Sequence, residues 1–143
     1  MTALTAGKPI KTRAGDQIGV GLLANAKVYA GGIAVLTSTG VARAAITGTG
    51  LKCIGYFEGS YDNTGGADKD VIANIKKDVL LCVNSTSTDA LTAADINSVC
   101  YLVDDQTVAK TNGTNTRSVA GRVQDVDDLG VWVYVGEPAT PTA

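Results

Sequence analysis

The chain lacks histidine entirely, and only 5% of its 143 residues are aromatic and 18% charged. Without histidine there can be no Ser-His-Asp or Cys-His nucleophile and no zinc or haem site that needs an imidazole ligand. The net charge of −2 and the pI of about 4.9 give no broad basic field. We therefore expect no catalytic residues, no metal, no cofactor and no direct contact with nucleic acid.

Long apolar runs are also missing, and the longest fall well short of the roughly 20 residues that span a membrane. The first residues lack the charged and apolar stretches of an export signal, so we expect neither a membrane anchor nor conventional export. The three cysteines, Cys53, Cys82 and Cys100, form no Cys-x-x-Cys pair. We expect them to be small core residues in a reducing compartment, with a disulfide between two of them as the alternative.

Acidic residues gather at two places, 104–105 and 125–128. The second group resembles the start of a calcium loop, but Leu129 and Gly136 stand where oxygen ligands belong. Neighbouring carboxylates in the first group diverge along an extended chain and form a poor acid/base pair. Both groups are predicted to be turns.

Short runs rich in Val, Ile, Leu and Tyr alternate with Gly, Asn and Asp clusters, which is typical of strands and turns. Only one short helix is expected, from Thr92 to about residue 98, and 59–69 is expected to be an exposed loop. The fold is thus predicted to be all-β, a compact β-barrel or β-sandwich with at most one short helix. The predicted strands are 17–23, 27–29, 33–36, 41–44, 53–58, 71–76, 79–83, 99–103, 108–110, 119–126 and 131–135.

The last predicted strand alternates clearly between its two faces. Val131, Val133 and Val135 would point to one side, and Trp132 and Tyr134 to the other. We expect the valines to face the core and the aromatic side to be covered by a loop or a partner.

The ends of the chain differ from its centre. Residues 1–16 have no hydrophobic period and are predicted to form an extended arm. Residues 17–136 are predicted to form a single β domain, and 137–143 a flexible C-terminal tail.

Four stretches of the sequence carry a resemblance to a known family: VYAGGIAVL with TGVA (28–36 and 39–42), VCYLVDDQTVAKT (99–111), RSVAGRVQDVD (117–127) and GVWV (130–133). In this order they resemble the small cement or decoration proteins of tailed-bacteriophage heads, and the likeness covers roughly residues 17–136. The resemblance implies a β-rich homo-oligomer that binds the outer surface of the capsid and bridges major capsid subunits. A trimer would suit three-fold lattice positions and a dimer two-fold ones; the residues match either, and we favour the trimer. The resemblance also implies assembly into the virion after synthesis in the host cytoplasm, and no catalytic residues.

From this resemblance we expect the arm to extend over the capsid and to add backbone hydrogen bonds to an exposed edge strand. Its cations would meet acidic groups of the major capsid protein, and the alternative is an arm without order or docking. The expected capsid-contact residues are Lys8, Pro9, Ile10, Lys11 and Arg13.

Two other functions stay open. The chain could be a receptor- or glycan-binding module of a virion fibre or spike; a cluster of exposed aromatic residues would favour this function, but the sequence has only one Trp, one Phe and five Tyr. It could also be a hydrolase that uses two carboxylates across a cleft.

Overall fold

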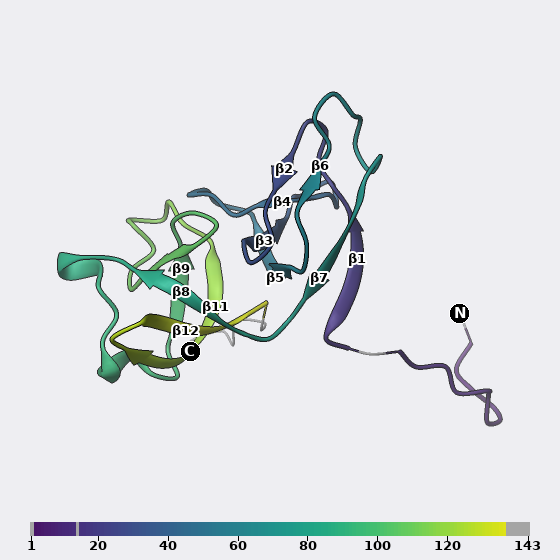
Figure 1. Ribbon diagram of the computed structural model, residues 1–143. Helices are drawn as coiled ribbons and strands as arrows, with labels where there is room; N and C mark the ends of the chain where they lie inside the picture. Colours follow the sequence, from purple (N-terminus) through teal and green to yellow (C-terminus); the bar gives the residue numbers. More distant parts are fainter. Residues whose placement is uncertain (1, 14, 137–143) are drawn as a thin grey trace.

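The computed structural model describes residues 2–13 and 15–136. The predicted C-terminal tail, 137–143, lies outside these residues. The fold is all-β, as predicted: the described part of the chain forms twelve strands, and its helical residues are confined to two single 3-10 turns, Ser87–Asp89 and Ala93–Asp95. The molecule has two halves, an N-terminal sheet and a C-terminal barrel (Figure 1).

The N-terminal half is an antiparallel sheet of five strands in the order β1-β7-β5-β3-β4, with β2 and β6 paired beside it. The residue after β1, Leu22, bridges to Ala42 in β4, so the sheet curls towards closure. Its strands are β1 (Gln17–Gly21), β2 (Lys27–Val28), β3 (Ile33–Leu36), β4 (Ala42–Ala44), β5 (Lys52–Phe57), β6 (Tyr61–Asp62) and β7 (Ile72–Lys76).

The C-terminal half is a closed barrel of five strands in the order β10-β8-β12-β11-β9. The ring closes where Val108 of β10 pairs with Leu102 of β9, and all neighbours are antiparallel except β8 and β10. The strands are β8 (Val79–Asn84), β9 (Val99–Leu102), β10 (Thr107–Ala109), β11 (Val119–Asp127) and β12 (Gly130–Val135).

Strand β3 has both faces buried and separates two hydrophobic cores. Ile33 and Val35 pack with the barrel interior, whereas Ala34 packs with Phe57 and Ile75 in the core of the N-terminal sheet. A continuous apolar run is what a strand covered on both sides requires. The two halves therefore share a layer rather than a simple linker.

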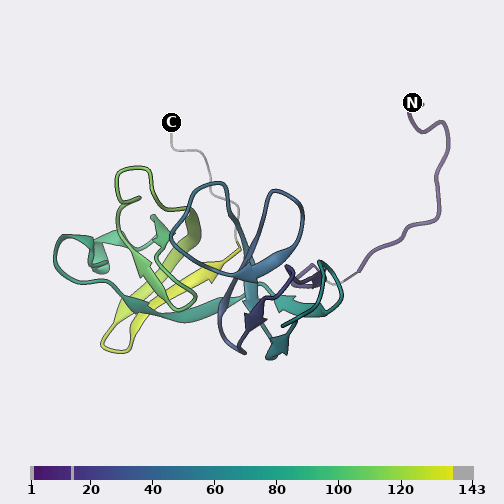
Figure 2. The same ribbon diagram turned by 90° about the horizontal axis from the view of Figure 1, so that it is seen from above.

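The chain passes from one half to the other through an extended segment, β7 followed by β8, seen as the teal ribbon in Figures 1 and 2. Ala73 and Ile75 of β7 face the core of the sheet, and Leu80 and Cys82 of β8 face the barrel interior. Because side chains alternate along a strand, the odd-numbered residues of β7 and the even-numbered residues of β8 point into the two cores. The opposite face of β8 is left on the outside of the barrel.

Most predicted strands occur within one or two residues of the expected positions, but two predictions are wrong in detail. The loop predicted at 59–69 contains β6, and Asn63 beside it is buried, with its amide donating to Leu23 O and Ala67 O. The sequence did not reveal β6 because a strand of two residues is too short to show alternation of apolar and polar side chains. The helix expected from Thr92 is a single 3-10 turn, in which the Asp95 carboxylate accepts the Thr92 backbone N–H.

We predict that Gly55→Ala destabilises the protein by about 2–4 kcal/mol, because a new methyl group adds overpacking to the strain of a positive φ. Gly55 lies in β5 at φ 140°, and a Cβ there would be 2.3 Å from the Lys76 carbonyl oxygen. Gly40→Ala is the matched control, since its φ is 82° and no atom lies within 4 Å of the new carbon. Urea unfolding measures both, and equal losses of stability would contradict the prediction.

Candidate functional site

The N-terminal arm is the most exposed segment of the structure. All residues from 2 to 13 are exposed, including Leu4 at 69% and Ile10 at 89%. None of them forms a hydrogen bond or an ion pair with residues 15–136. In both views the arm runs away from the sheet and from the barrel (Figures 1 and 2). Its apolar and charged groups are therefore presented outwards, not used to hold the fold together.

Residues 2–13 of the arm carry positive charge only. Lys8, Lys11 and Arg13 are its ionisable side chains, and no Asp or Glu occurs between residues 2 and 13. The predicted contact residues Lys8, Pro9, Ile10 and Lys11 surround a shallow hollow of about 450 Å³ within the arm itself. Such a segment can offer apolar contacts and cations to one partner at the same time.

Arg13 is the predicted contact residue that shares a hollow with residues of the body. With Gln17, Gly19, Glu58 and Asn74 it lines an open hollow of about 370 Å³ at the root of the arm. The Gln17 side-chain amide donates to a Glu58 carboxylate oxygen at 3.2 Å. Its lining is mostly polar, and none of the lining residues pairs a nucleophile with a neighbouring base.

A second open hollow, of about 410 Å³, lies where the β2–β3 turn meets the β9–β10 turn. Tyr29 lines it and is 57% exposed, and the Lys27 ammonium lies 5.9 Å from the centre of the tyrosine ring. Asp105, from the β9–β10 turn, lines it as well. The hollow thus combines one exposed aromatic ring with one carboxylate. A broad glycan-binding surface would need several exposed aromatic rings side by side.

The acidic groups singled out in the sequence are part of turns. Asp104 accepts the backbone N–H groups of Gln106 and Thr107 at 2.9 and 2.8 Å, which closes the turn between β9 and β10. Asp127 accepts the Trp132 indole N–H at 2.9 Å and the Leu129 backbone N–H at 2.8 Å. These hydrogen bonds, that of Trp132 foremost, lower the pKa of Asp127. Within the described residues, no group of three or more His, Cys, Asp or Glu side chains could hold a metal ion.

The three cysteines are free thiols that pack in or against the barrel core. Burial raises the pKa of Cys53 to about 11 and that of Cys82 to about 12, and it also raises the pKa of Cys100. Since the thiolate is the nucleophile, thiols of this kind are unreactive near neutral pH. The cysteines thus serve as small core residues.

Exposed and half-buried apolar side chains also cover one wall of the barrel. We call this set the barrel band; it consists of Val79, Leu81 and Val83 on β8, and Trp132 and Tyr134 on β12. The exposed fractions of Leu81, Val83 and Tyr134 are 39%, 49% and 37%. The sequence predicted that Trp132 and Tyr134 would share a face, but the contribution of β8 was missed because its apolar run does not alternate with polar residues.

No protein-family model, no curated protein and no solved structure matches this chain. Among residues 2–13 and 15–136 there is also no helix with the length and apolar character that crossing a membrane requires. The geometry of the arm and of the barrel band is therefore the ground on which a function can be proposed.

We predict that none of the cysteines reacts within minutes with a thiol-specific disulfide reagent at about pH 8, because their raised pKa values keep them protonated and burial restricts access. Unfolding in guanidinium chloride returns the pKa values to their ordinary range, so all three thiols should then react at once. The absorbance of the chromophore that the reagent releases gives the number of thiols that have reacted. Rapid reaction of any thiol in the folded protein would contradict this assignment.

Proposed function

We propose that this chain is a structural protein of a bacteriophage virion, which binds the outer surface of the capsid and stabilises the lattice by bridging major capsid subunits. It acts without catalysis or a cofactor. Its partners are the major capsid protein and further copies of itself. The proposal rests on the resemblance to capsid cement proteins and on the form of the arm.

The arm is the observation that carries the proposal. A segment that exposes Leu4 and Ile10 and forms no polar contact with residues 15–136 contributes little to the stability of its own fold. Exposed aliphatic side chains next to cations are suited to a partner with an apolar strip and acidic borders. Lys8, Pro9, Ile10, Lys11 and Arg13 are the residues that we assign to the capsid contact.

The extended form of the arm suits recognition by strand addition. Residues 2–13 belong to no strand or helix of this chain, so their backbone groups can pair with an exposed sheet edge. Pro9 has no N–H to donate and is tolerated only at an edge, which limits continuous pairing to one side of it. Contacts of the three cationic side chains would then fix the register in which the arm pairs with the edge strand of the capsid protein.

Stabilisation of a capsid follows from mass action. A protein that binds the assembled lattice more tightly than dispersed subunits shifts the equilibrium towards the closed shell. Each contact through a short arm is weak, but an oligomer presents several arms at once, and linkage raises the overall affinity.

We predict that replacing Lys8, Lys11 and Arg13 together by Glu reduces retention on purified capsids at least about tenfold, because three attractive contacts with acidic groups become repulsive. Deletion of residues 2–13 should have the same or a larger effect. Co-sedimentation with capsids measures retention, and added salt should weaken wild-type binding because exposed charges are screened.

The matched control replaces three exposed lysines of the body, Lys27, Lys52 and Lys69, by Glu. This change alters net charge as much as the arm variant does but leaves the arm intact. Undiminished retention of the deletion variant would refute the proposed capsid contact, and equal losses in the arm variant and the control would show that only net charge matters.

The second candidate is a receptor- or glycan-binding module on the virion surface. It is favoured by Tyr29, an exposed ring beside the hollow that Asp105 also lines. A sugar ring can stack on the tyrosine while its hydroxyl groups bond to the carboxylate. If this candidate holds, Tyr29→Ala abolishes binding of the protein to host-cell glycans on an array, and the arm deletion leaves that binding unchanged.

A further inference from the structure

The barrel band belongs to two rows of paired residues on the outer wall of the barrel, and an irregularity of β11 at Gln124 separates the rows on that strand. In the first row, Val79 of β8 is opposite Tyr134 of β12, and Tyr134 is opposite Arg122 of β11. In the second row, Leu81 is opposite Trp132, and Trp132 is opposite Asp125. Directly opposed residues point to the same face of a sheet, so each row presents an aliphatic, an aromatic and a charged side chain in that order.

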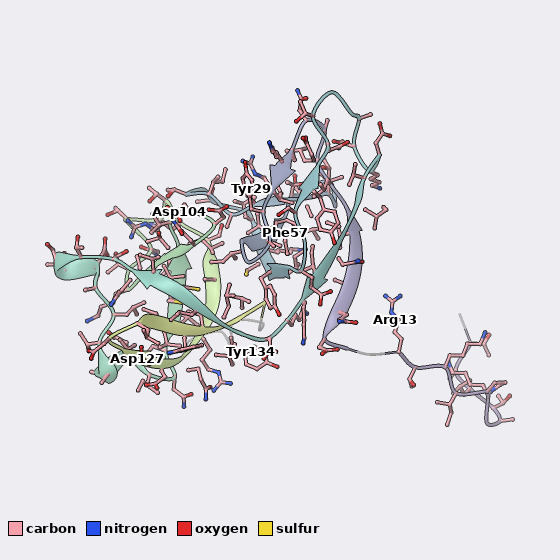
Figure 3. The ribbon with its side chains drawn as sticks, viewed as in Figure 1. Arg13, Tyr29, Phe57, Asp104, Asp127 and Tyr134 are labelled. Carbon is pink, nitrogen blue, oxygen red and sulfur yellow. The ribbon has the colours of Figure 1, made fainter. Side chains whose placement is uncertain are left out.

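The wall is not covered by the rest of the chain that the structure describes. Leu81 and Tyr134 are exposed in spite of their apolar surface, and Asp125 is exposed beside them. Figure 3 shows Tyr134 and Asp127 on the side of the barrel formed by β12 and β11, while the arm with Arg13 leaves on the far side of the molecule. Neighbouring exposed apolar side chains with a charged border are typical of a protein contact surface.

The charges of the two rows are opposite. Arg122 ends the first row, and its guanidinium donates to the Asn97 side-chain oxygen at 2.7 Å. Asp125 ends the second row, with one carboxylate oxygen accepting the Val126 backbone N–H at 2.8 Å. A surface that carries a cation in one row and an anion in the next is complementary to its own copy when the order of the rows is reversed.

We propose that the barrel band is a self-association surface, at which two copies of the chain pack face to face around a two-fold axis lying between the two rows. A two-fold contact brings the same patch of both copies together, so the first row of one copy faces the second row of the other. Arg122 then meets Asp125 of the second copy, Tyr134 meets Trp132, and Val79 meets Leu81. Each of these contacts occurs twice.

In this arrangement each side chain meets a chemically compatible side chain of the second copy. Aliphatic side chains meet aliphatic ones, aromatic rings meet in the offset or edge-to-face geometries that they prefer, and the outer contact joins opposite charges. Two sheet faces packed in this way lie about 10 Å apart, which leaves room for both sets of side chains. The two-fold contact differs from the trimer that we favoured from the sequence, and it does not depend on binding to a capsid.

Charge reversal with mixing of variants tests the proposal on the purified full-length protein. Wild type should sediment as a dimer, with twice the chain mass of 14.6 kDa, at concentrations of about 100 µM, where even weak contacts are populated. Arg122→Asp and Asp125→Arg should each weaken self-association at least about tenfold, since each sets like charges against one another twice.

An equimolar mixture of the two variants should recover the dimer, because both charge contacts are then attractive again. If either substitution weakened the dimer only by disturbing the fold of its own chain, mixing the two variants would not recover the dimer. Asp128→Arg is the matched control, an exposed carboxylate three residues from Asp125 in the turn after β11, and it should leave the dimer unchanged. Trp132, the sole tryptophan, reports the contact by a blue shift of its fluorescence at high concentration.

Leu81→Asp provides a second variant, which places a charge against Val79 of the second copy, at the aliphatic end of the contact, and should give a folded monomer. Circular dichroism and thermal unfolding check that each variant keeps its fold. A monomeric wild type at the highest concentration, a wild-type trimer, or single variants that associate as wild type does would each overturn the proposal. So would a mixture of the two charge variants that stays monomeric.

Discussion

The layer formed by β3 and β5 between the two cores is the constraint on which the remaining structure depends. Ile33 and Val35 complete the barrel interior from outside the barrel, and Phe57 fills the core of the sheet. The backbones also come close there: a Cβ added at Gly136, after β12, would be 2.8 Å from the Ile54 carbonyl carbon. Neither half can therefore shift against the other without opening a core, and the surfaces of both halves keep a fixed relation.

The groups with potential for chemistry are used to build this scaffold. Asp104 and Asp127 close hairpin turns through backbone N–H groups, and the cysteine thiols are buried as apolar packing. Asp89 links two loops, since it accepts from Arg117 at 3.2 Å and also bonds the Thr111 hydroxyl. What the fold leaves for function is surface, namely the arm and the barrel band, and such surfaces fit recognition of other proteins.

The arm and the barrel band lie in different halves of the molecule, so they can be used at the same time. A dimer joined through its barrels would present two arms with a fixed separation, and binding of the first would raise the effective concentration of the second. A bridging function depends on this combination of a rigid body with several flexible contacts. Shared use of one surface for both partners would instead make self-association and capsid binding compete.

The sequence by itself determined the all-β fold, most strand positions and the extended, cationic character of the arm. These follow from local patterns: period-two alternation, turn residues such as the Asp pairs, and the absence of any hydrophobic period before Gln17. Only the tertiary structure decided the strand order, the position of β6 and the outward face of β8. Strand pairing joins residues far apart in the chain, and the run from Val79 to Val83 is apolar at every position, so its side chains could face either way until the barrel closed around the even-numbered ones.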